Sequence, residues 1–106
     1  MKVYIAGPTS DLKQFKLMAE ELKRAGFEPI YIADKENKMT AKEYTEATYK
    51  SLATCDAVFL LDNWDISEVV MSEIYFAHKH KIRIARNIYE LHQIKERLKC
   101  KKKDQD

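Results

Sequence analysis

The chain has 106 residues, of which 45% are hydrophobic and only two are glycine and two proline. These values exclude a linker or a low-complexity segment and predict one globular domain. The 19 basic and 17 acidic residues leave a net charge of +2, which gives no reason to expect a nucleic-acid partner. No segment has the apolar stretch of a signal peptide or the ~18 apolar residues of a membrane span, so we expect a cytoplasmic protein without membrane contact.

A buried strand and a helix are predicted at the start of the chain. Residues 2–6 (KVYIA) form a short apolar run, which the turn residues Gly7 and Pro8 close. Apolar side chains then recur at helical spacing over residues 15–22, and Gly26 supplies a C-terminal stop for this helix.

A second strand and a second helix follow. Residues 27–32 (FEPIYI) predict a strand, and its internal Pro29 lacks an amide donor and therefore favours the edge of a sheet. Thr40 and Glu43 have the spacing of a capping box, which predicts a helix from there to about Thr54.

The next segment predicts the centre of the sheet. Residues 56–61 (DAVFLL) form an almost unbroken apolar run, as is typical of a parallel strand covered on both faces. Asp65 and Glu68 repeat the capping-box spacing and predict a helix that reaches about His80. Residues 82–85 (IRIA) predict a short fourth strand.

A last helix is expected to begin at Asn87 and Glu90. We expect the domain to span residues 1–98 and residues 99–106 to form a basic, disordered tail. Four strand–helix units predict the α/β class: a three-layer α/β/α sandwich, flavodoxin- or Rossmann-like, with a parallel sheet of four or five strands.

Ligands bind such sheets beyond the carboxyl ends of the strands, where the strand order reverses. The loop of Gly7, Pro8, Thr9 and Ser10 follows the first strand, and its amides and hydroxyls could hold an anion. It matches no Walker or dinucleotide-binding loop, so a tight turn with a helix cap is the alternative. Trp64, the only tryptophan, could cover a planar ligand or simply pack at a strand end.

Glu73 stands where the helical pattern requires an apolar residue. On a helical wheel it falls about 40° from Val69, between that residue and Ala77. A buried carboxylate costs several kcal/mol unless it is paired, burial raises its pKa, and such groups concentrate at functional sites. The alternatives are a glutamate that reaches sideways to a Lys or Tyr, or one at a dimer interface.

The remaining reactive residue types form no recognisable site. His78 and His80 diverge on a helix, and His92 is isolated. Cys55 and Cys100 lie far apart in the sequence and have no metal-ligand spacing. We therefore expect neither a metal nor a cofactor.

The order of motifs resembles that of the small DUF4406 proteins. The chain opens with MKVYIAGP, a Tyr-containing second helix leads into CDAVFLL, and a Trp precedes S-x5-E at the start of the third helix. DUF4406 proteins belong to the nucleoside 2-deoxyribosyltransferase-like superfamily, together with the 2′-deoxynucleoside 5′-phosphate N-hydrolases. The resemblance, over about residues 1–86, implies a homo-oligomeric N-glycosidase, acting by hydrolysis or base transfer on a small-molecule nucleoside or (deoxy)nucleoside 5′-monophosphate.

The resemblance also assigns roles to individual residues. It implies that Glu73 is the nucleophile, which attacks the anomeric carbon and releases the base. Ser67 matches the serine that contacts the 5′-phosphate in the nucleotide hydrolases. Gly7, Thr9 and Ser10 would line the first loop of the pocket.

Two departures from the family pattern leave other functions open. Thr48 occupies the position at which family members carry an Asp, and Glu46 and Glu43 are the candidate replacements for that Asp. Val69 and Val70 replace the usual small pair between the serine and the glutamate, and would crowd a sugar or phosphate.

Two alternatives to catalysis are open. The first, which these departures suggest, is a catalytically degraded module that binds or senses a nucleotide. The second is an oligomeric structural protein, in which Tyr44 and Tyr49 of the second helix serve as an interface.

Overall fold

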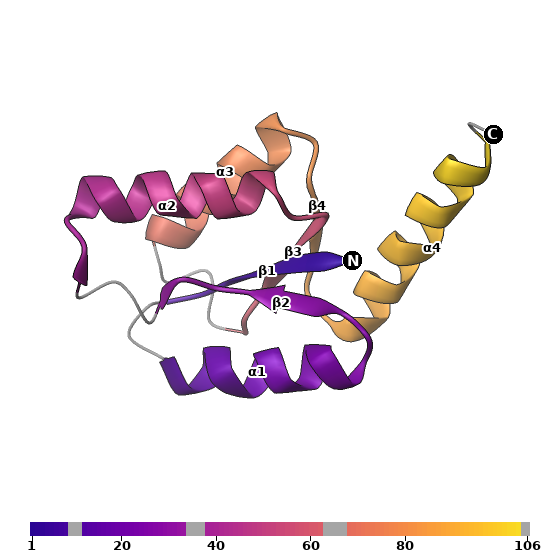
Figure 1. Ribbon diagram of the computed structural model, residues 1–106, viewed down its shortest axis with the longest axis horizontal. Coiled ribbons are helices and arrows are strands. Elements are labelled where there is room, and N and C mark those ends of the chain that lie inside the picture. The colour runs from indigo at the N-terminus through magenta and orange to yellow at the C-terminus, as the bar shows by residue number, and fades with distance from the viewer. Residues whose placement is uncertain (9–11, 34–37, 63–67, 105–106) are drawn as a thin grey trace.

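The computed structural model describes residues 1–8, 12–33, 38–62 and 68–104. These residues form strands and helices in strict alternation, which confirms the predicted α/β class (Figure 1). In chain order the elements are β1 Lys2–Ala6, α1 Leu12–Arg24, β2 Glu28–Ile30, α2 Ala41–Ala53, β3 Ala57–Leu60, α3 Glu68–Lys79, β4 Arg83–Ala85 and α4 Ile88–Asp104.

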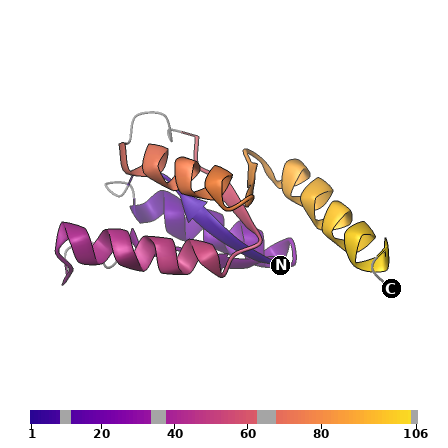
Figure 2. The same cartoon turned by 90° about the horizontal axis from the view of Figure 1, so that it is seen from above.

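The four strands form one parallel sheet in the order β2-β1-β3-β4. β2 lies at an edge, as Pro29 predicts, and the apolar strands β1 and β3 lie at the centre. Buried residues of α1 and α4 pack on one face of the sheet. Those of α2 and α3 pack on the other face, which gives the predicted three layers (Figure 1). Seen from above, α2 and α3 lie side by side (Figure 2). The strand order reverses between β1 and β3, so this is where a ligand is expected.

Hydrogen bonds from backbone amides to side chains cap the starts of two helices. At α2, the Glu43 amide donates to Thr40 Oγ1 at 3.1 Å and the Thr40 amide donates to Glu43 Oε1 at 3.3 Å, which confirms the predicted capping box. At α4, the Glu90 amide donates to Asn87 Oδ1 at 2.8 Å and the Arg86 amide donates to Glu90 Oε2 at 3.2 Å. The capping box predicted for α3 involves Asp65, which lies outside the described residues.

Two helices are followed by a residue in the left-handed backbone conformation. Gly26, after α1, has a φ of 91°, as its predicted role as a helix stop requires. Lys81, after α3, has a φ of 59°, and the Ile82 amide donates to the Ala77 carbonyl at 2.8 Å across it. This left-handed conformation costs a lysine about 1 kcal/mol relative to a glycine.

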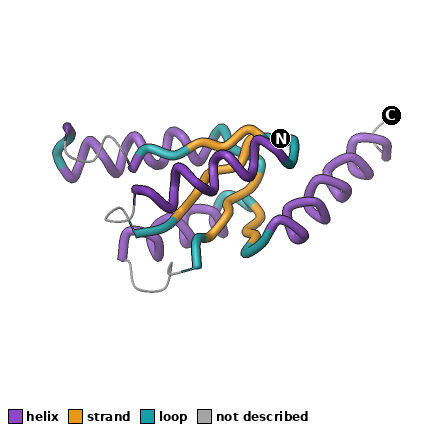
Figure 3. The backbone as a smooth tube through the Cα atoms, turned by 90° about the horizontal axis from the view of Figure 1, so that it is seen from below, coloured by secondary structure: helices purple, strands orange, loops and turns teal. Residues whose placement is uncertain are grey.

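The end of α4 differs from the prediction. The helix continues to Asp104, so residues 99–104 are helical rather than a disordered tail. Lysine is a good helix former, and lysines near a helix C-terminus interact favourably with its dipole. Leu91 and Ile94 anchor α4 on the sheet, and the rest of the helix slants away from the body beside β4 (Figure 3). Within the described ranges, no helix is long and apolar enough to cross a membrane.

Candidate functional site

Glu73 lies on the face of α3 that packs on the sheet, and only 3% of its surface is exposed. Val70 and Ala77, about one turn on either side of it, are completely buried. The prediction that this glutamate is buried is therefore confirmed. Val69, which the helical wheel places beside Glu73, is 40% exposed and is therefore not part of the buried apolar stripe.

Three polar side chains from three elements meet beneath α3. Tyr4 of β1, Thr48 of α2 and Glu73 are all buried, and the Tyr4 phenol hydrogen-bonds the Glu73 carboxylate. The Thr48 hydroxyl also lies close to the phenol. Even so, Thr48 Oγ1 and Glu73 Oε2 make no well-formed hydrogen bond with any described residue. Buried polar atoms are rarely left unpaired, so both atoms are available to a ligand.

The electrostatics of this cluster follow from its burial. Desolvation raises the pKa of Glu73 to about 8, and the hydrogen bond from Tyr4 offsets only part of that rise. Desolvation and the neighbouring carboxylate raise the pKa of the Tyr4 phenol far above its usual range. Tyr4 is thus a permanent hydrogen-bond donor, and about a tenth of Glu73 is ionised at pH 7. No cation in the described part of the chain pairs with Glu73.

A cavity of about 390 Å³ between α2 and α3 has Glu73 and Thr48 in its wall. This volume is within the range of small-molecule sites. The other described residues that line it are largely apolar, aromatic or hydroxyl-bearing: Met39, Thr40, Ala41, Tyr44, Thr45, Tyr49, Val69 and Ser72. A carboxyl group with an unpaired oxygen therefore borders a cavity whose other described lining residues carry no charge.

Aromatic packing fixes one wall of this cavity. The Tyr49 ring stacks on Phe76 of α3 with their centroids 4.6 Å apart and an interplanar angle of 9°. Tyr44 lines the same cavity and is almost fully buried. These two tyrosines, considered above as a subunit interface, are thus part of the candidate site.

The first loop is only partly described. Gly7 and Pro8 are buried, and a Cβ on Gly7 would lie 2.5 Å from Leu61 Cδ1. Packing against Leu61 therefore explains the glycine at this position. Neither Gly7 nor Pro8 is among the residues that line the cavity. Four predicted ligand contacts lie outside the described residues: Thr9, Ser10, Trp64 and Ser67.

Sequence reasoning offered a tyrosine as one alternative partner of Glu73 but did not identify Tyr4, although a signal for it was present. Its hydroxyl interrupts the apolar run of β1, and a buried phenol needs a hydrogen-bond partner. The glutamates considered as replacements for the family Asp do not serve that role. Glu43 is engaged in the α2 cap, and Glu46 is exposed and outside the cavity wall.

Comparison with known proteins gives one match. A family model described as Domain of unknown function (DUF4406) matches residues 1–86, which end just before α4. No curated protein and no solved structure matches the chain. All the described residues of the cavity wall lie within residues 1–86, so the site belongs to the part of the chain that the family model matches.

Proposed function

We propose that this chain, which belongs to the DUF4406 family, is an N-glycosidase acting on a nucleoside or deoxynucleoside 5′-monophosphate. The observation that carries the proposal is Glu73, a buried carboxylate with an unpaired oxygen in the wall of a small-molecule cavity. A buried polar atom without a hydrogen-bond partner destabilises the fold, and buried carboxyl groups with a raised pKa are concentrated at functional sites.

The proposed reaction has two displacements at the anomeric carbon. Ionised Glu73 forms a bond to C1′, and the bond from C1′ to the base nitrogen breaks with its electron pair leaving on the base, which takes up a proton. Water then attacks C1′, loses a proton and releases the sugar and the carboxylate. If a second base attacks instead of water, the outcome is base transfer.

Tyr4 acts in this scheme as a positioning residue. Its phenol holds the carboxylate by a hydrogen bond and favours the ionised form, which is the nucleophile. The high pKa of Glu73 also makes the ionised carboxylate a stronger nucleophile than an exposed one. These two effects together predict activity that increases with pH up to about 8.

The cavity wall supplies contacts suited to a nucleoside. Tyr49, fixed by Phe76, offers an aromatic surface to a planar base. The hydroxyls of Thr45 and Ser72 are available to the sugar. Ser67, which the resemblance assigns to the 5′-phosphate, lies outside the described residues.

Chromatographic detection of free base tests the proposal. The chain is incubated with a panel of ribo- and deoxyribonucleosides and their 5′-monophosphates, and base release is followed over pH 6–9. We expect Glu73→Gln to abolish release, because an amide cannot form the glycosyl ester. The matched control is Glu46→Gln, an exposed glutamate of α2 outside the cavity wall. Equal base release by Glu73→Gln and the unmodified chain would disprove the assignment.

A second candidate is a module that binds a nucleotide without cleaving it. It is favoured by Thr48, because the described cavity wall contains no carboxylate besides Glu73 to protonate the leaving base. This candidate predicts a nucleotide-dependent rise in melting temperature with no free base. A rise accompanied by free base identifies the enzyme instead.

A further inference from the structure

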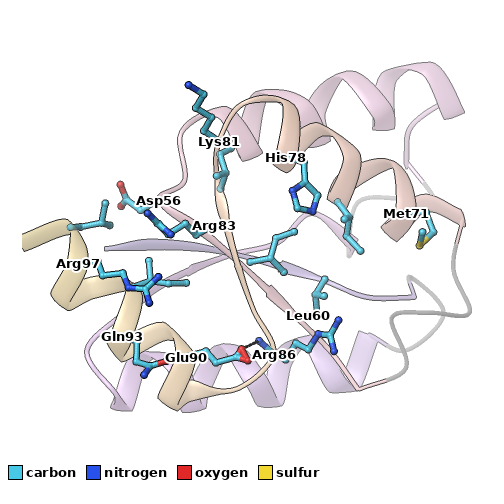
Figure 4. A pocket seen from close by; sticks show the side chains of 15 residues that line it. Asp56, Leu60, Met71, His78, Lys81, Arg83, Arg86, Glu90, Gln93 and Arg97 are labelled. Carbon is cyan, nitrogen blue, oxygen red and sulfur yellow. Dashed lines mark hydrogen bonds between the residues drawn. The ribbon is translucent and has the colours of Figure 1, made fainter. Parts of the chain in front are cut away.

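A groove of about 900 Å³ follows the free edge of the sheet at β4. Among the described strands β4 pairs only with β3, so its other side offers backbone groups to which no described strand is paired. Figure 4 shows β4 running between the two helices that flank the groove. His78 and Met71 project from α3 on one side, and Gln93 and Arg97 project from α4 on the other.

The two walls of the groove differ in chemistry. Ile84 packs with Leu60 and Ile74 on the α3 side, which makes that wall apolar. Arg83 alternates with Ile84 along the strand and therefore faces the α4 side, where Arg97 lies (Figure 4). The α4 side thus carries the arginines, beside the apolar Ile94 and Leu98 of α4.

The groove has excess positive charge. Its two acidic residues accept hydrogen bonds from the chain's own amides: Asp56 Oδ2 from Lys2 at 2.9 Å, and Glu90 Oε2 from Arg86 at 3.2 Å. Lys81, Arg83 and Arg97 are exposed, and their side chains make no ion pair within the described ranges. These three cations are therefore available to an acidic partner.

We propose that this groove binds an extended segment of a partner protein, in which acidic residues alternate with apolar ones, as a fifth strand beside β4. Successive side chains of a strand point to opposite faces. Acidic side chains of the segment would meet Arg83 and Arg97, and apolar ones would meet Ile74 and Ile84. The backbone of the segment would satisfy the free edge of β4.

Two other occupants fit the groove less well. A second copy of the chain, pairing β4 with β4, would bring the Arg83 side chains and the neighbouring cations together, and like charges on facing strands repel. A nucleic acid would meet the arginines but has no apolar chain for the wall formed by Leu60, Ile74 and Ile84.

The test uses the full chain and fluorescein-labelled peptides of about six residues, the length of a typical strand. One peptide alternates glutamate with valine, a second alternates lysine with valine, and a third has three glutamates followed by three valines. Fluorescence anisotropy is measured with chain concentrations up to about 1 mM. We expect saturable binding of the alternating glutamate peptide, with the other two roughly tenfold weaker or undetectable.

Charge reversal locates the site. We expect Arg83→Glu combined with Arg97→Glu to weaken binding of the glutamate–valine peptide roughly tenfold or more. The matched control is Lys13→Glu with Lys16→Glu, which changes the net charge equally at exposed positions of α1. If the double Glu variant does not fold, Arg83→Gln with Arg97→Gln is used, with a smaller loss expected. Amide NMR shifts on titration should centre on residues 81–86.

Several outcomes would overturn the proposal. These are no binding of the glutamate–valine peptide, equal binding of the lysine peptide or block peptide, and equal losses in the groove and α1 variants. Preferential binding of a single-stranded oligonucleotide would assign the groove to nucleic acid instead. A dimer in sedimentation that Met71→Glu converts to a monomer would assign it to a second copy.

Discussion

Tyr4 of β1 and Glu73 of α3 are joined by a hydrogen bond that links the central strand to the helix layer beside the cavity. The phenol donates and the carboxylate accepts, so the bond stabilises the ionised form of Glu73. Because burial opposes ionisation more strongly, the pKa of Glu73 is a balance between these two effects. This balance can be shifted one side chain at a time.

Tyr4→Phe removes the hydrogen bond while keeping the ring. The pKa of Glu73 should then rise above its value of about 8, since desolvation acts alone. Base release at pH 7 should fall severalfold and recover as pH is raised, because the ionised fraction is what decreases. A pH profile of kcat/KM checks this. A loss of the same size at every pH would contradict it and indicate a packing defect.

Glu73→Gln should remove a pH dependence of stability. The folded pKa of Glu73 is about 8 and the ordinary value is 4.5, so the folded state holds the proton more tightly. Its contribution to stability is fully present below about pH 4.5 and is lost as pH rises towards 8. The unmodified chain should therefore lose a few kcal/mol over this window that Glu73→Gln does not lose. Urea unfolding at several pH values measures the difference, and parallel curves would contradict it.

The sequence predicted those parts of this molecule that depend on local signals. Thr40 and Glu43 set the start of α2, and the position of Glu73 in an apolar stripe predicted its burial. The contact of Glu73 with Tyr4 depends instead on how α3 is placed over β1, which no local pattern specifies. The end of α4 was also missed, since a run of lysines is compatible with both a tail and an isolated helix.

Gly7→Ala should destabilise the fold through Leu61. The added Cβ would lie 2.5 Å from Leu61 Cδ1 and 3.0 Å from its Cβ, and Leu61 is buried. We expect a loss of about 1–3 kcal/mol, as for other overpacked cores. In a double-mutant cycle with Leu61→Ala, the combined loss should be smaller than the sum, because the clash disappears with the leucine. Additive losses would show that contact with Leu61 is not the cause.

Lys81→Gly should stabilise the chain. Lys81 has a φ of 59°, where glycine has no steric cost, and it is exposed. We expect a gain of about 0.5–1 kcal/mol in urea unfolding. The control is Lys79→Gly at the last residue of α3, where glycine should lower stability by less than the about 1 kcal/mol that it costs in a helix interior. A loss of stability for Lys81→Gly would contradict the strain attributed to this position.

Thr48→Asp tests whether the cavity lacks only a proton donor. The new carboxyl would lie in the buried cluster with Tyr4 and Glu73, where two carboxylates cannot both ionise easily. One of them should stay protonated near neutral pH and be able to donate its proton to the departing base. We therefore expect base release to increase, with optimum activity at the pH where the pair carries a single proton, and stability above that pH to fall. Chromatography across pH 5–9 measures base release, and unfolding curves over the same range measure stability. If Thr48→Asp folds and binds nucleotide but releases no base, the cavity lacks more than this one group, and a role in binding alone is the better description.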